Sequence, residues 1–583
     1  MKRLQVIKSS FTTPRLLLAA GLSGLALGAQ AQSQPGKGRP RGTIQDAEIE
    51  VVKDRVNTLP EATRNFEKIR LAPPPKPTRQ LTYTYPDFRL PATRLSPSVQ
   101  VLTVAQEELE PLTGNYLKLG VGNYGSVYGR AHLHAVRNSQ YSYGLDVRHN
   151  SSRTGPVDGQ NSGASQTSAA LTGEYYLGTA AVGAELNYAH DVYHFYGYDA
   201  ARLAVSPDQA AIRQSFNRFG ARAYARNRAP DAPLTYEVGV GFRHFGDHYD
   251  VSENNLLLDG KVGYALSETS RLTVDAQGSF ISDQQPATFG GLISTATRKR
   301  NFFQVTPAYE LRSKTGLSLT LGLTYGYSSD TLNHVSKSQL NPAVRVGYAV
   351  VPEKFQLYAG LGGAIQRVTR YDLSQENPWL APSQTLADTH AGPTVYAGFT
   401  AAPVSGLELA ARATYSRTKN LYFYRNNLDD LSKFDLVYDE SAIGVFSLHT
   451  EALYSAAEKV RVGLKADYNK YSVKSLEYAF GRPAFIGTLY GTYNASNKLL
   501  LGATLYYYSP NYGVIHVNRD PAFSINAGQT NAVVDLSLRA DYRITPKFSI
   551  FAMGNNLANR HYQRYLNYQS QGINAIGGLT YSF

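Results

Sequence analysis

The stretch INAIGGLTYSF, residues 573–583, has the two-residue period of a β-strand with two unlike faces. One face carries Ile573, Ala575, Gly577, Leu579, Tyr581 and Phe583, and the other is dominated by Asn574, Gly578, Thr580 and Ser582. Successive side chains of a strand point to opposite sides, so one side of this strand is apolar and the other polar. The sequence therefore predicts a terminal strand that is apolar on one side and ends on an aromatic residue.

The N-terminus has the pattern of a secretory signal peptide. Lys2, Arg3, Lys8 and Arg15 precede an apolar run from Leu16 to Leu27, and Ala29-Gln30-Ala31 supplies small residues for cleavage before Gln32. The run is too short to span a membrane, and no later segment has the roughly 18 apolar residues that a spanning helix needs. Residues 1–31 are therefore expected to be removed from an exported chain that has no membrane helix.

Many further segments alternate like the terminal strand. In 460–471, Val462 and Leu464 alternate with Arg461 and Lys465, and four leucines in 317–323 alternate with Ser, Thr and Gly. A wet lumen accepts charges on one face while lipid takes the apolar face, whereas a soluble sandwich tends to have shorter strands with less charge. We predict an all-β fold, a transmembrane antiparallel β-barrel of about 22 strands over residues 116–583.

The expected connections alternate between two kinds. Short turns are expected at 138–140, 177–180, 227–233, 267–270, 313–315, 351–354, 403–406, 455–459, 494–498 and 543–547. Mostly long loops lie between them, at 150–164, 197–211, 282–300, 328–340, 369–392, 418–442, 472–482, 509–531 and 558–572, with short connections at 123–125 and 246–252. Tight periplasmic turns and longer external loops are typical of outer-membrane barrels.

Composition narrows the function. The chain has 43 Tyr, which suits lipid–water interfaces, and no Cys, which excludes disulfides, thiolate metal sites and a Cys nucleophile. The formal charge of +13 fits anionic partners such as lipid phosphates or solutes, or a solvated surface. No long basic tract indicates nucleic acid.

The stretch MGNNLANRHY, residues 553–562, followed by Gly572 and the terminal strand, resembles the last hairpin of TonB-dependent receptors. That hairpin typically carries Asn-Leu-x-Asn-x-x-Tyr before a Gly and a terminal aromatic residue. The barrel size extends the resemblance as architecture. It implies an outer-membrane protein of a Gram-negative bacterium that takes up or binds a solute, with TonB as a possible partner. The terminal strand, ending on Phe583, is expected to engage the barrel-assembly machinery.

Residues 32–115 depart from that family, whose members place a folded plug before the barrel. The segment is rich in Pro, including Pro73-Pro74-Pro75, and favours extended or polyproline conformation in the periplasm or the lumen. Glu48-Ile49-Glu50-Val51-Val52 resembles the short extended segment that binds TonB by strand addition, and the alternative is a short strand or helix in a periplasmic linker. A wide barrel needs a filled lumen, so this segment, inward-folded loops or a partner protein should fill it. The alternative function is a plugless scaffold or channel component of an outer-membrane complex.

Few residues suggest a metal, ligand-binding or catalytic site. Pairs of histidines at His190/His194 and His244/His248 and the oxygen-rich stretch Asn426–Asp430 are weak metal candidates, because rim histidines in water and ordinary loop turns have the same pattern. Tyrosines at 422, 424, 506–508 and 512 fit either ligand stacking or girdle and loop packing. No nucleophile elbow or carboxylate pair stands out, so we expect no enzyme, no catalytic residues and no cofactor, and the metal question stays open.

Overall fold

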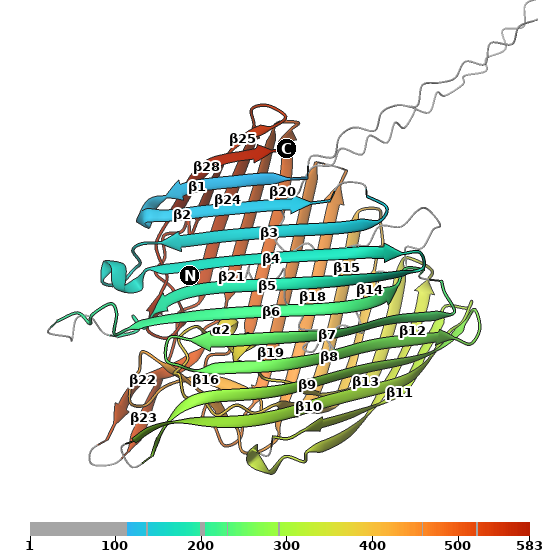
Figure 1. The fold of residues 1–583 in the computed structure, drawn as a ribbon, viewed down its shortest axis with the longest axis horizontal. Helices are drawn as coiled ribbons and strands as arrows, with labels where there is room; N and C mark the ends of the chain where they lie inside the picture. Colours follow the sequence, from blue (N-terminus) through green and yellow to red (C-terminus); the bar gives the residue numbers. More distant parts are fainter. Residues whose placement is uncertain are drawn as a thin grey trace, which may run out of the picture. The chain divides into compact units, whose positions relative to one another are not determined.

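A computed structural model describes residues 114–135, 138–198, 205–229, 231–289, 292–330, 332–457, 459–519 and 523–583. The expected signal peptide, the Glu48–Val52 stretch and nearly all of the Pro-rich segment lie outside these ranges. Within them, 22 antiparallel strands form one closed sheet (Figure 1). The first strand pairs with the last, from Tyr116 opposite Ser582 to Gly122 opposite Ile576. The predicted all-β barrel and its strand count are confirmed.

The barrel strands follow one another in chain order around the wall. They are β1 (Tyr116–Gly122), β2 (Ser126–His134), β3 (Tyr141–Ser152), β4 (Ala164–Leu177), β5 (Ala180–His194), β6 (Arg213–Asn227), β7 (Leu234–Asp247), β8 (Ser252–Ala265), β9 (Ser270–Phe289), β10 (Leu292–Arg312), β11 (Leu317–Ser328), β12 (Ser338–Val351), β13 (Phe355–Gln366), β14 (Thr389–Ala401), β15 (Leu407–Lys419), β18 (Ile443–Ala456), β19 (Val460–Ser472), β20 (Phe485–Ser496), β21 (Leu499–Tyr508), β24 (Val533–Arg543), β25 (Phe548–Asn555) and β28 (Asn574–Ser582).

The alternation in the sequence places apolar side chains outside and polar ones inside. On β19, Leu464 is 44% exposed on the outer face. Its neighbour Lys465 lies on the other face and forms an ion pair with Glu451 of β18 at 3.2 Å. The outer face of β28 likewise exposes Leu579 and Tyr581. This is the distribution that a lipid-facing surface around a wet lumen requires.

Glycines on the inner face give room to tyrosines of the neighbouring strand. A Cβ on Gly360 of β13 would lie 2.4 Å from the ring of Tyr396 on β14, and one on Gly463 of β19 would lie 2.2 Å from the ring of Tyr490 on β20. Each glycine is directly opposite its tyrosine in the register. The tyrosine rings therefore lie flat over backbone where any larger residue would displace them.

All the predicted short turns lie at one end of the barrel, here called the turn end, and the long connections lie at the other, the loop end. One predicted loop is wrong. Residues 282–300 continue the ladder of β9 and β10, which pair from Ser270–Leu311 to Phe289–Leu292, so the loop is a long hairpin. Its polar alternation resembles a loop in composition, but the extended pairing satisfies the backbone groups.

The other long connections contain small elements of their own. They are η3 (Asn123–Gly125), η4 (Gly159–Ser162), η5 (Leu332–His334), α2 (Arg370–Glu376), β16 (Tyr422–Asn426), β17 (Phe434–Tyr438), β22 (Tyr512–Asn518), β23 (Ser524–Gln529), β26 (Gln563–Tyr565) and β27 (Tyr568–Gln569). The labels of α2, β16, β22 and β23 gather at one end of the barrel in Figure 1. Among the described residues, no helix is long and apolar enough to cross a membrane.

Candidate functional site

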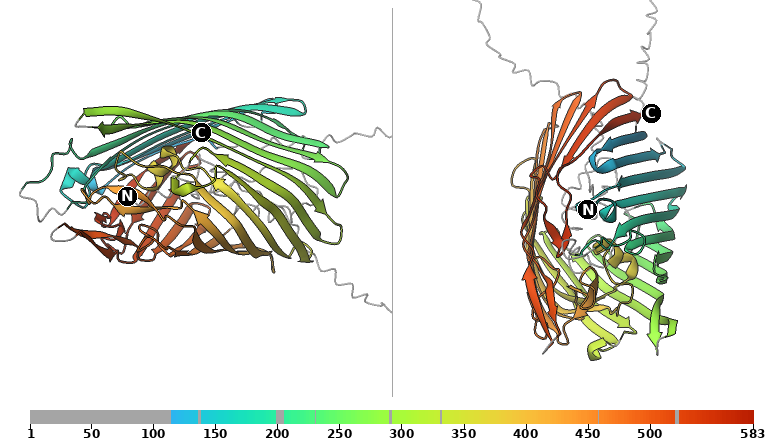
Figure 2. Two further views of the ribbon diagram at one scale, coloured as in Figure 1. Left: turned by 90° about the horizontal axis from the view of Figure 1, so that it is seen from below. Right: turned by 90° about the vertical axis from the view of Figure 1, so that its left-hand side faces the viewer.

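The connection between β13 and β14, residues 367–388, folds inward at the loop end and is called here the lumen loop. In the end-on view of Figure 2 its short helix α2 lies within the ring of strands. Leu373, Trp379 and Leu386 of this loop are at most 3% exposed. Thr369 caps α2, because its side chain accepts a hydrogen bond from the backbone of Asp372. Of the three candidates for filling the lumen, inward-folded loops are therefore present.

Charged residues of the barrel wall hold the start of the lumen loop. Glu253 of β8 accepts hydrogen bonds from the first two backbone N–H groups of α2, those of Arg370 at 3.0 Å and Tyr371 at 3.4 Å. A carboxylate at this position satisfies donors that a helix start leaves unpaired. The Arg370 guanidinium in turn forms an ion pair with Asp283 of β9. Two adjacent wall strands therefore fix α2 through buried ionic contacts.

A second ionic cluster holds the end of the lumen loop. Arg300 of β10 donates to Asp388 at 2.6 Å, to Asp330 at 2.9 Å and to the backbone carbonyl of Val368 at 2.7 Å. All three charged side chains are 2% exposed. Burial raises the pKa of the Asp388 carboxyl, although Arg300 opposes this shift. The Ser328 hydroxyl and the Val368 N–H also donate to the Asp388 carboxylate. Arg300 and Asp388 together therefore join Val368, near the start of the loop, and Asp388, at its end, to the wall.

Trp379, the only tryptophan of the chain, is the centre of an aromatic cluster. Its ring stacks on Tyr568 with centroids 3.9 Å apart. Its indole N–H donates to the backbone carbonyl of His194 at the end of β5, at 3.1 Å. Tyr193, Tyr196 and Tyr565 approach its edges. This packing joins the lumen loop to β5 and to the connection between β25 and β28.

The opposite side of the lumen loop contacts the β16–β17 hairpin. The Glu376 carboxylate accepts from the hydroxyls of Tyr422 at 2.8 Å and Tyr424 at 2.5 Å. Leu380 forms a parallel bridge with Phe434. The tyrosines at 422 and 424, for which ligand stacking and loop packing were both open, therefore pack against the lumen loop. The loop extends from strands β6–β10 to loops on the other side of the barrel.

The residues that resemble a TonB-dependent receptor hairpin hold the last connection in shape. Asn556 donates to the backbone carbonyl of Arg560 at 2.7 Å, and Asn559 accepts from the backbone N–H of Ile573 at 3.2 Å. Both asparagines have positive φ, 50° and 49°, which asparagine tolerates better than most residues. Tyr562 donates to a carboxylate of β24. The motif thus acts as a folded turn that precedes the closing strand.

The histidines named by the sequence do not come together. Each has its own neighbour: His190 bonds Asn217, His194 bonds the Gly163 carbonyl, His244 bonds Asn254, and His248 packs on Tyr249. β6 separates the two pairs. In the described ranges, no group of three or more His, Asp or Glu side chains is placed to hold a metal ion.

The oxygen atoms of 426–430 bond within their own loop and to the neighbouring connection between β21 and β24, where Asn426 accepts from Val514 and Asp429 from Arg519. The Asn427 side chain accepts from the backbone N–H groups of Asp429 at 2.9 Å and Asp430 at 2.8 Å. Asp430 accepts from Ser432 and forms an ion pair with Lys433. Asn-led turns of this kind are common in loops. Of the other tyrosines, Tyr512 stacks on Tyr478 at 4.0 Å.

Sequence reasoning missed the wall residues that hold the lumen loop. Arg300, Glu253 and Asp283 belong to alternating polar faces, where charges are ordinary in a barrel lumen. The single Trp379 in a long connection was the one available signal of a buried anchor, since tryptophan is seldom placed in a solvated loop without a packing role.

Solved structures share the fold of this chain, although its sequence matches no known family. No protein-family model matches the chain, and no curated protein matches it by sequence. Solved structures match over most of their length. The FrpB iron transporter from Neisseria meningitidis (F3-3 variant) has a TM-score of 0.61 at 12% identity, covering 82% of each chain. The siderophore receptor PirA from Acinetobacter baumannii has a TM-score of 0.59 at 9% identity, covering 82% of this chain and 81% of that one. The ferric-catecholate import receptor Fiu from E. coli K12 has a TM-score of 0.58 at 12% identity, covering 81% and 82%.

At such identities the likeness concerns the fold. The chain is a closed antiparallel β-barrel of 22 strands and shares its fold with these transporters and receptors, in agreement with the predicted strand count and with the resemblance of the last hairpin.

Proposed function

We propose that this barrel takes up or binds a solute in the outer membrane of a Gram-negative bacterium, and that the lumen loop is the gate on its external side. The matching structures carry the names of iron transporters and siderophore receptors, which supports uptake as the class of function. TonB is the proposed source of energy, and the barrel-assembly machinery the proposed partner of the strand ending on Phe583. The proposal gives the chain no enzymatic activity.

The observation that carries the proposal is how the lumen loop is held. Its two ends contact the wall through Arg300–Asp388 and Arg370–Asp283, which are buried ion pairs. A buried ion pair adds little net stability compared with apolar packing, but it fixes one geometry. When the loop leaves the wall, water can replace these partners. Closure by such contacts suits a gate that must be both well defined and reversible.

Ion conductance in planar bilayers tests the gate. Gln366 and Thr389 pair at the strand ends, so a short Gly-Ser turn can replace residues 367–388 without separating β13 from β14. We expect the full mature chain to conduct poorly and the variant without the lumen loop to show large, stable steps. The matched control is Arg222→Met, which removes a lumen-wall arginine that contacts Glu185, Glu237 and Asp259 but not the loop.

The outcomes separate the proposal from a scaffold or channel role. Large conductance of the full chain, or no change on loop removal, contradicts the gate. A further variant that lacks residues 32–96 then shows whether the N-terminal segment closes the lumen instead. In the source bacterium, uptake should be lost without TonB, whereas a scaffold should retain its partner proteins and be indifferent to TonB.

A further inference from the structure

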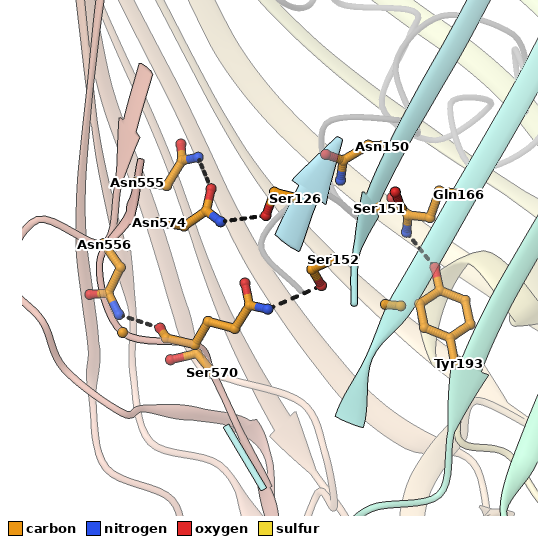
Figure 3. A pocket seen from close by; sticks show the side chains of 13 residues that line it. Ser126, Asn150, Ser151, Ser152, Gln166, Tyr193, Asn555, Asn556, Ser570 and Asn574 are labelled. Carbon is orange, nitrogen blue, oxygen red and sulfur yellow. Dashed lines mark hydrogen bonds between the residues drawn. The ribbon is translucent and has the colours of Figure 1, made fainter. Parts of the chain in front are cut away.

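A polar cavity of about 60 Å³ lies at the loop end, between the first and last strands of the barrel. Figure 3 shows two walls that face each other across it. Asn555, Asn574 and the end of the β25–β28 connection form one wall, and Asn150, Gln166 and Tyr193 of β3, β4 and β5 form the other. By the usual volume per buried water, the cavity has room for about four to six water molecules.

Hydrogen bonds within each wall fix the side chains that line the cavity. Asn555 donates to Asn574 at 3.3 Å, and Asn574 donates to Ser126 at 3.1 Å. Gln571 donates to Ser152 at 3.1 Å and so connects the two walls. These contacts orient the amides before any ligand arrives, which lowers the entropy cost of binding.

The chemistry of the lining selects a class of ligand. None of the thirteen lining residues is charged, and ten of them are Asn, Gln or Ser. A divalent cation needs carboxylates and an anion needs Arg or Lys, so neither has its usual partners here. Amides and hydroxyls both donate and accept, and they match a ligand whose groups also do both. Within the described residues, the side-chain amide of Asn150 has no hydrogen-bond partner, so it is available to such a ligand.

From this lining we infer that the cavity binds an uncharged, polyhydroxylated solute such as a neutral oligosaccharide. The inference rests on the proposed function, since it names the class of solute that the barrel admits. The cavity accommodates the hydroxyl groups along one edge of a sugar ring, which replace ordered water there. The rest of the oligosaccharide extends from the cavity.

The cavity is in contact with the anchor of the lumen loop. Tyr193, which receives a hydrogen bond from Gln166, lies edge-on to Trp379 at 6.5 Å. Ser570 of the opposite wall lies two residues from Tyr568, which stacks on Trp379. A ligand between the walls therefore contacts Tyr193, which packs on Trp379, and Ser570, which lies two residues from the tyrosine that stacks on Trp379. Because this is the only tryptophan, its fluorescence reports the cavity without a label.

The test uses the full mature chain in detergent micelles, titrated separately with maltohexaose, cellohexaose and chitohexaose. Calorimetry measures binding, and Trp379 emission is recorded in parallel. We expect saturable binding of at least one hexaose together with an emission change. Asn150→Ala should weaken it about tenfold, the effect of losing one or two hydrogen bonds to the side-chain amide. The matched control is Asn187→Ala, which removes an asparagine from β5 outside the cavity.

Three results would overturn the inference. They are no hexaose binding at concentrations up to about 10 mM, hexaose binding that Asn150→Ala leaves unchanged, and binding of ferric enterobactin that Asn150→Ala weakens. The last would replace the neutral ligand by an anionic iron complex. Each result leaves the conductance test of the lumen loop unaffected, so failure of the ligand class is distinguishable from failure of the gate.

Discussion

Removing Arg300 should release the lumen loop. Its guanidinium is the shared partner of Asp330 and Asp388 and also holds the carbonyl of Val368. In Arg300→Met the Asp388 carboxylate, 2% exposed, loses its cation, and it remains beside Asp330, which keeps its ion pair with Arg298 at 2.8 Å. Breaking a buried ion pair in this way costs about 3–5 kcal/mol. The ratio of open to closed loop should therefore rise by about 100-fold to several thousand-fold.

A thiol in the lumen loop measures that ratio directly. The chain has no cysteine, so Ser374→Cys introduces the only thiol, at a position 4% exposed in the closed loop. The side chain of Ser374 contacts Arg218 at 3.2 Å, so a water-soluble maleimide reaches position 374 mainly when the loop opens. Where opening is fast, the labelling rate follows the open population, and Arg300→Met should raise it by the same factor.

Two comparisons decide whether the reasoning holds. Arg222→Met should leave the labelling rate of the cysteine at position 374 within about threefold, since Arg222 contacts wall carboxylates and the wall residue Tyr224. A labelling rate that Arg300→Met does not change would refute the role of the ionic cluster. Equal acceleration by both variants would show a general weakening of the barrel instead.

Three further outcomes follow from the packing. Trp379→Ala, which empties the aromatic cluster, should cost about 3–5 kcal/mol of loop closure and raise the same labelling rate. Leu464→Arg on the lipid face should destabilise the barrel by about 2–4 kcal/mol, measured by unfolding in lipid vesicles. Thr488→Arg on the lumen face should destabilise it much less. Equal losses of stability would contradict the assignment of the two faces. Gly360→Ala places a methyl group against the ring of Tyr396 and should lower the denaturant midpoint of unfolding. The double variant with Tyr396→Ala should recover part of the lost midpoint, because the ring is no longer there to be displaced.

The sequence by itself determined the wall of this protein. A strand forces neighbouring side chains to opposite faces, so the positions of Leu464 and Lys465 follow from their order in the chain. Each turn between strands involves only neighbouring residues, so its position could be predicted from the residues of the turn. The stretch 553–562 holds its own fold, because Asn556 and Asn559 bond within the connection that they begin. The prediction was wrong at residues 282–300, where β9 and β10 extend as a long hairpin, because polar residues are common both in loops and in such hairpins.

Only the tertiary structure decided what closes the lumen. The backbone N–H of Asp388 donates to Asp330 across 58 residues of sequence, and the backbone N–H of Arg370 donates to Glu253 across 117. Every one of these charges is unremarkable where it stands, because a wet lumen tolerates charge at any inward position. Their burial and pairing arise when the closed barrel brings distant strands around one loop. No local pattern encodes this, since the free energy of such contacts depends on partners that the chain order does not place together.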